Sequence, residues 1–245
     1  MNNLAKESLV FAERVGDGWK DAPMPDCLAA QEQFLCRQAF GAYHTAKSFW
    51  ILHENGRLTD CIVLARNLLE RIVNSTFGWK SPNHAVELIA HEYNTTIKQA
   101  EQWDTLLGGS PNLQQVITEN KKALRAVLSL LNKTEAGDWK IFKRFEECGS
   151  GMERCYRSLY FHFSRYAHAG FEVPRPGKHN EPSEASEFVA LLAPVLTAIN
   201  YHRRDGHECS HGKCRIGDEG MALAGRFSNP IKALGSNLIW DATSM

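Results

Sequence analysis

Apolar side chains recur along most of this chain at intervals of three and four residues, which places them on one face of an α-helix. The segment 58–77 shows the pattern well, with apolar residues at Ile62, Leu64, Ala65, Leu68, Leu69, Ile72 and Val73. The sustained alternation of apolar and polar residues that marks a half-buried strand is absent from the sequence. The pattern therefore predicts an all-α protein.

Capping residues divide the chain into separate helices. Ser81 and Ser110 each precede a proline, as expected of an N-cap followed by proline in the first turn, and Gly108 ends one helix. We predict helices over residues 26–55, 58–77, 82–107, 111–132, 138–148 (capped by Asp138), 151–168 and 183–204. They form a multi-helix bundle with a central polar cluster and an irregular C-terminal appendage.

The length of 245 residues fits one large domain. We assign residues 1–25 to an N-terminal extension, residues 26–204 to the bundle and residues 205–245 to the appendage. Positive and negative side chains number 28 each, so no overall charge attracts nucleic acid or anionic lipid. We expect no membrane span and no secretory signal. Seven scattered cysteines suit a reducing compartment, and we expect a cytoplasmic protein.

Polar residues at helical spacing provide the candidate chemistry. Tyr160, Ser164 and His168 are each four residues apart, so a helix aligns a phenol, a hydroxyl and an imidazole in one column. His168 precedes Gly170 at the helix end and could act as a general acid or base near neutral pH. Arg66 and Glu70 share a face of an earlier helix, either as a surface ion pair or as a buried pair able to hold an anion.

These two patterns together resemble an all-helical, largely bacterial family, domain-of-unknown-function family 5677. The resemblance covers about residues 26–204 and rests on the Arg66/Glu70 pair preceding the Tyr160/Ser164/His168 column. It implies that the five side chains form one internal polar cluster. The function of the family is not established, so the resemblance implies a site without a reaction.

A looser resemblance is to HEPN-type ribonucleases and toxin-like defence proteins, which carry an Arg followed four to six residues later by a His. Arg157 and His162 have that spacing. The resemblance implies metal-independent RNA cleavage, in which Arg and His act on the scissile phosphate and the 2′-hydroxyl attacks, and it implies homodimers. It competes with the column, because His162 and His168 point about 120° apart on a helix.

The appendage holds a third candidate site. His207, Cys209, His211 and Cys214 lie within eight residues and could hold structural zinc as a closed set of four ligands. The Cys-x4-Cys spacing differs from common zinc knuckles, and a solvated polar loop is the alternative. The candidate chemistry of the Tyr160/Ser164/His168 column requires no metal.

The leading hypothesis is a metal-independent effector of a bacterial defence or toxin-like system that cleaves RNA or a nucleotide. In it His168 is the acid or base, Arg66 holds the phosphate, Glu70 orients Arg66, and Tyr160 and Ser164 place the imidazole or substrate. A protein partner from a defence or toxin–antitoxin operon is expected with it. The alternative is a non-enzymatic helical binding or regulatory protein whose cluster is structural or binds a small ligand.

Overall fold

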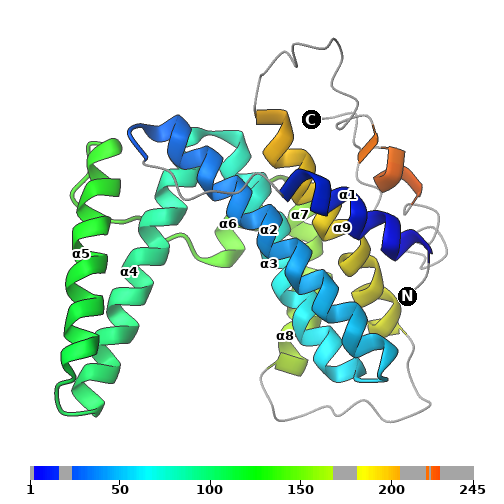
Figure 1. The fold of residues 1–245 in the computed structure, drawn as a ribbon, viewed down its shortest axis with the longest axis horizontal. Coiled ribbons are helices and arrows are strands. Elements are labelled where there is room, and N and C mark those ends of the chain that lie inside the picture. Colours follow the sequence, from blue (N-terminus) through cyan, green and yellow to red (C-terminus); the bar gives the residue numbers. More distant parts are fainter. Residues whose placement is uncertain (1–2, 17–23, 168–180, 205–218, 221, 227–245) are drawn as a thin grey trace.

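The computed structural model describes residues 3–16, 24–167, 181–204, 219–220 and 222–226, and the described residues form helices and no strand (Figure 1). The long helices are α1 (Asn3–Gly16), α2 (Cys27–Glu54), α3 (Leu58–Lys80), α4 (Pro82–Leu106), α5 (Pro111–Leu130) and α9 (Glu181–Arg204). The short ones are α6 (Ile141–Glu147), α7 (Ser150–Cys155), the π-helical turn η1 (Tyr156–Tyr160) and α8 (Phe161–Ala167). The prediction of an all-α bundle is confirmed.

The predicted helix boundaries follow local capping chemistry. The Asp26 carboxylate accepts a hydrogen bond from the Ala29 amide at 2.8 Å and begins α2. Ser81 begins α4 in the same way, but the Ser110 side chain makes no cap bond; its amide instead donates to the Asp104 carboxylate at 2.7 Å. Gly108 follows α4 with φ 71°, a conformation that glycine adopts at low cost.

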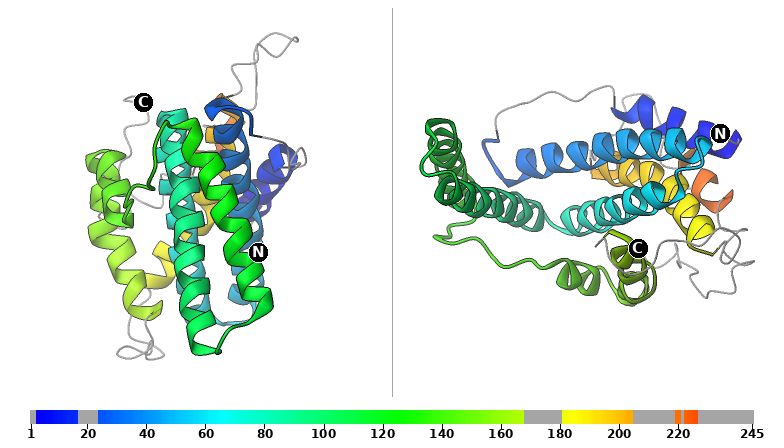
Figure 2. Two further views of the ribbon diagram at one scale, coloured as in Figure 1. Left: turned by 90° about the vertical axis from the view of Figure 1, so that its left-hand side faces the viewer. Right: turned by 90° about the horizontal axis from the view of Figure 1, so that it is seen from below.

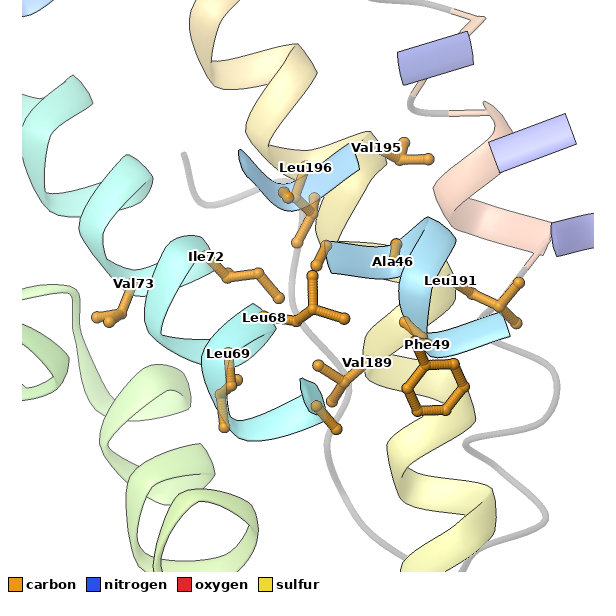
Figure 3. Close-up of a cluster of buried hydrophobic side chains, with 14 of the residues drawn as sticks. Ala46, Phe49, Leu68, Leu69, Ile72, Val73, Val189, Leu191, Val195 and Leu196 are labelled. Atoms are coloured by element: carbon orange, nitrogen blue, oxygen red, sulfur yellow. The ribbon is translucent and has the colours of Figure 1, made fainter. Parts of the chain in front are cut away.

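The main core lies between α2, α3 and α9, which pack side by side (Figure 3). Phe49 of α2, Leu68 of α3 and Val195 of α9 are completely buried there. A buried polar contact joins two of these helices, because the Asn200 amide of α9 donates to the Ser75 hydroxyl of α3 at 3.0 Å. The site described below is therefore attached to a firmly packed α3.

The core extends beyond residues 26–204. Helix α1 packs against α2 and α9 and contributes Ala5, Leu9 and Phe11 to the main core, although it lies in the segment assigned to an N-terminal extension. Leu223, from the segment assigned to the appendage, is also part of that core. Both segments thus supply buried surface to the bundle.

Helices α4 and α5 form an antiparallel hairpin that projects from the bundle (Figure 1). Seen from below, the hairpin stands at one end of the molecule, away from α1 (Figure 2, right). At its base α4 packs against α2 and α3, where Phe34, Phe77 and Val86 form a second core. Farther along, the hairpin buries only a small cluster of Ile97, Ala100 and Ile117.

Two of the predicted helices differ from the structure. Asp138 does not cap a helix, because α6 begins only at Ile141, where no side chain caps it. The Trp139 indole donates to Glu87 and its carbonyl accepts from Arg144, and these contacts hold the chain before α6 out of the helix. The predicted helix 151–168 is interrupted by η1, so its first part, α7, is one residue out of register with α8.

Candidate functional site

One face of α3 carries a row of polar side chains. Arg66, Glu70 and Asn74 follow one another at four-residue intervals and so lie on the same side of the helix. Leu68 and Ile72, between them in sequence, are buried in the main core. The amphipathic pattern that packs α3 against the bundle therefore also directs this row away from the core.

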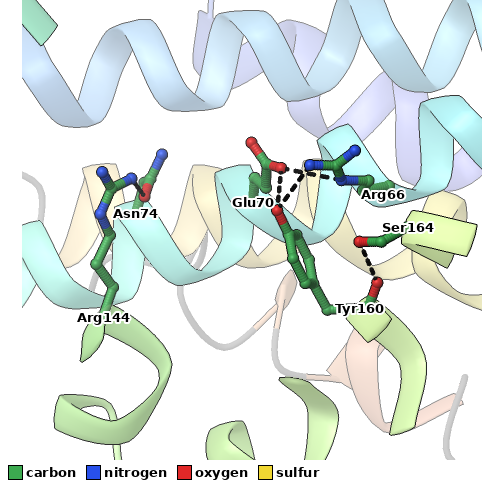
Figure 4. A network of polar contacts seen from close by, with 6 residues as sticks. All are labelled: Arg66, Glu70, Asn74, Arg144, Tyr160 and Ser164. Carbon is green, nitrogen blue, oxygen red and sulfur yellow. Dashed lines mark hydrogen bonds and ion pairs between the residues drawn. The ribbon is translucent and has the colours of Figure 1, made fainter. Parts of the chain in front are cut away.

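Tyr160, at the end of η1, meets this row. Its hydroxyl accepts a hydrogen bond from Arg66 Nη2 at 3.0 Å and donates one to Glu70 Oε1 at 2.7 Å (Figure 4). The Arg66 guanidinium carbon also lies 5.1 Å from the centre of the Tyr160 ring. The structure thus brings together three of the five side chains predicted to form one cluster, from two helices 90 residues apart in sequence.

Arg66 retains unused hydrogen-bonding capacity. Its Nε lies 3.4 Å from Glu70 Oε1, an ion-pair distance, yet this buried nitrogen has no hydrogen-bond partner among the described residues. The side chains of Arg66 and Glu70 are 23% and 33% exposed. A buried donor without an acceptor is costly and uncommon. The pair therefore borders solvent, while the Arg66 Nε atom itself is buried.

The Tyr160 phenol is held in its neutral form. Burial and the hydrogen bond to Glu70 together raise the pKa of Tyr160 to about 12, against the lowering effect of the Arg66 contact. The ring stacks on Tyr156 with centroids 5.1 Å apart and packs against Phe145. At neutral pH Tyr160 is accordingly a fixed hydrogen-bond donor and not a base or a nucleophile.

The π-helical turn separates Tyr160 from the helix that precedes it. Such turns insert one residue into an α-helix and occur often at functional sites. Ser164 lies one turn beyond Tyr160, but its hydroxyl donates to the Tyr160 carbonyl at 2.8 Å (Figure 4). The Ser164 hydroxyl thus bonds to a carbonyl of its own helix and makes no hydrogen bond to Arg66 or Glu70.

Arg144 of α6 lies beside the same row and was not singled out from the sequence. Its Nε donates to the Trp139 carbonyl at 2.8 Å and its Nη1 donates to Asn74 Oδ1 at 2.9 Å (Figure 4). Burial lowers the pKa of Arg144, while the negative charges of Glu92 and Glu70 raise it. The guanidinium is therefore charged, desolvated and fixed in orientation by two hydrogen bonds.

Arg71 is a third guanidinium near these carboxylates. It lies against the bare backbone of Gly41 in α2, where a Cβ atom would come 2.1 Å from Arg71 Nη1. Burial lowers the pKa of Arg71, and the charges of Glu92 and Glu70 act in the opposite direction. No hydrogen bond to this guanidinium comes from the described part of the chain. Arg71 is thus a second desolvated cation with free donors.

We call this group the arginine cluster and define it as Arg66, Arg71, Arg144, Glu70, Glu92, Asn74 and Tyr160. Glu92 is exposed to water; partial desolvation of its carboxyl group raises its pKa, while the charges of Arg144, Arg37 and Arg71 lower it. With both carboxylates ionised, the defined residues carry a net charge of +1, and Arg37 adds a further positive charge near Glu92. A partly desolvated excess of positive charge favours an anion.

Two further predicted site residues that the structure describes, Arg157 and His162, are not joined to this cluster. Arg157 pairs with Glu153 on its own helix at 2.7 Å and is exposed. His162 packs its ring against Tyr166, and no contact links it to Arg157 within the described residues. His168 lies outside the described residues.

The four candidate zinc ligands, His207, Cys209, His211 and Cys214, also lie outside the described residues. Within the part of the chain that the structure describes, no group of three or more His, Cys, Asp or Glu side chains could hold a metal ion. In that part, too, every helix is too short or too polar to cross a membrane.

Fold and site together define a helical-bundle protein with a partly open, arginine-rich polar cluster between α3, α6 and the π-helical turn. The chain belongs to a family of unknown function, DUF5677, whose profile matches residues 34–182. That range contains every residue of the arginine cluster. No curated protein and no solved structure gives a significant match.

Proposed function

We propose that this protein is a cytoplasmic binding protein for a phosphate-bearing ligand, either RNA or a nucleotide, and that the arginine cluster is its binding site. The observation that carries the proposal is the imbalance of charge in a partly desolvated place. Arg66 has a buried, unpartnered Nε, and Arg71 is partly desolvated. Guanidinium groups are the side chains best matched to phosphate, since their planar forks donate two parallel hydrogen bonds.

Each polar neighbour has a distinct part in this proposal. Glu70 and the neutral Tyr160 hydroxyl hold the Arg66 guanidinium in one orientation, at 3.4 Å and 3.0 Å. Asn74 does the same for Arg144. Pre-oriented donors lose little side-chain entropy on binding, so a small anion gains more from them than from free surface arginines.

The experiment is a binding titration of the purified protein with a labelled single-stranded RNA and, separately, with a nucleoside triphosphate. We expect Arg66→Gln and Arg144→Gln each to weaken binding at least tenfold. The matched control is Arg57→Gln, because Arg57 is 66% exposed and pairs only with Asp60 at the start of α3. Wild-type affinity in the two cluster variants, or no binding of either ligand, would contradict the proposal.

Cleavage of the bound ligand is the second candidate function. It is supported by Arg66, whose guanidinium is held in place by the Tyr160 hydroxyl and would face a phosphate bound there. The sequence then offers His168, eight residues after Tyr160, as the general acid or base of a metal-independent, HEPN-like effector. A defence or toxin–antitoxin operon would supply its partner.

This second candidate is tested by expressing the wild type and His168→Ala and comparing growth arrest and RNA integrity, with EDTA in the parallel in vitro assay. We expect arrest and EDTA-resistant cleavage with the wild type alone. If both forms bind the ligand and neither cleaves it, the protein is the non-enzymatic binding or regulatory protein of the first proposal.

A further inference from the structure

The outer part of the α4–α5 hairpin exposes large apolar side chains. The exposed fractions are 59% for Trp103, 75% for Leu106, 64% for Leu107 and 38% for Val116. We call these four residues the hairpin apolar surface. Single exposed apolar residues are ordinary, but a tryptophan grouped with two leucines and a valine at the end of a projecting element is a feature of interaction sites.

Helix geometry places these side chains on one side of the hairpin. At 100° per residue, Leu107 lies about 40° and Leu106 about 60° from Trp103 around α4, whereas Glu101 lies about 160° away. Glu101 pairs with Lys121 of α5 at 2.7 Å, which marks the charged side of the hairpin. Val116 lies about 140° from Lys121 around α5 and so on the apolar side.

The same region has little core of its own. The small cluster of Ile97, Ala100 and Ile117, with Leu124 packed against it, is all that the outer hairpin buries among the described residues. Two helices alone cannot surround a core, and helical bundles are completed by further helices. The hairpin is thus an amphipathic pair whose apolar side has no helix of the described bundle over it.

We infer that the hairpin apolar surface binds the same surface of a second copy of this chain, and that two hairpins pack as a four-helix bundle across a two-fold axis. The apolar area that two copies would bury supports a second copy as the partner. The four side chains expose on the order of 400 Å² per copy, or about 800 Å² in a symmetric pair. With the usual apolar fraction of about 60%, the whole interface would bury about 1,300 Å². That lies within the range of stable interfaces.

The inference does not rest on the arginine cluster, which is on a different part of the molecule. It is tested by measuring the mass of the full-length protein by light scattering and sedimentation equilibrium over a hundredfold range of concentration. We expect a dimer at micromolar concentration. Leu107→Glu should raise the dimer dissociation constant at least tenfold, because each two-fold interface would bury two carboxylates.

The matched control is Ile51→Glu, which places the same charge on an apolar residue of α2 that is 56% exposed. We expect it to remain dimeric. Circular dichroism checks that each variant is folded, and Trp103→Gln replaces Leu107→Glu if the latter is not. A wild type that is monomeric throughout, or a dimer that both hairpin variants leave intact, would overturn the inference.

Discussion

Replacing Tyr160 by phenylalanine removes one oxygen atom and with it two hydrogen bonds at the centre of the arginine cluster. The hydroxyl accepts from Arg66 at 3.0 Å and donates to Glu70 at 2.7 Å. The ring, its stacking on Tyr156 and its packing against Phe145 stay in place. The substitution therefore isolates the polar contribution of this residue from its packing.

The expected cost follows from the surroundings of the two partners. Hydrogen bonds to charged groups contribute about 1.5–3 kcal/mol each, so losing two sets an upper limit of about 3–6 kcal/mol. Arg66 and Glu70 keep their mutual ion pair at 3.4 Å, and both side chains are partly exposed. Water and the ion pair recover much of the loss, which leaves an expected destabilisation of about 1–2 kcal/mol. For a chain of this size that corresponds to a melting temperature lower by about 3–6 °C.

The measurement is urea unfolding followed by circular dichroism, with the midpoint and slope compared between variants. The control is Tyr156→Phe, an identical chemical change on the adjacent ring, whose hydroxyl receives no hydrogen bond from the described residues. We expect the control to stay within about 0.5 kcal/mol of the wild type. If both variants lower the free energy of unfolding equally, or if Tyr160→Phe does not lower it, the hydroxyl is not the link between α3 and η1.

Three further predictions follow from single contacts. In an alkaline titration monitored by tyrosine absorbance, Tyr160 should ionise near pH 12. Because its pKa in the folded protein exceeds the unfolded value of 10, its contribution to stability is present below pH 10 and is lost between pH 10 and 12. The wild type should therefore lose stability relative to Tyr160→Phe across that window. Gly41→Ala should displace the Arg71 guanidinium and weaken anion binding about fivefold or more, with the melting temperature unchanged or higher, since alanine favours a helix. Gly78→Ala should lower unfolding stability by about 1–3 kcal/mol in urea, because the added methyl would come 2.7 Å from the buried Phe34 ring; a stability equal to the wild type would contradict that packing.

The parts of this structure that depend on local chemistry could be predicted from the sequence. The four-residue spacing of Arg66 and Glu70 places them on one face of α3 whatever surrounds the helix. Asp26 and Ser81 cap α2 and α4 through bonds to amides only two or three residues away. The meeting of α3 with Tyr160 needed a second source of information, namely the family resemblance, because the two segments lie 90 residues apart.

The parts that depend on tertiary contacts could not be predicted in this way. Arg144 belongs to a seven-residue helix, and only the folded chain shows that its guanidinium reaches Asn74. Arg71 follows Glu70 directly in sequence and so points to another side of α3, where its position depends on the absence of a side chain at Gly41. A π-helical turn has no sequence marker here, since Tyr156–Tyr160 contains neither glycine nor proline.

Helical spacing alone overstates the column of Tyr160, Ser164 and His168. Four-residue spacing aligns side chains, but each hydroxyl donates to whichever acceptor lies within its reach. For Ser164 that acceptor is the Tyr160 carbonyl of its own helix, at 2.8 Å. The Tyr160 hydroxyl stands at the end of a long ring, beyond the reach of its own backbone, and therefore bonds across to α3. Side-chain length, more than sequence spacing, decides which member of the column enters the arginine cluster.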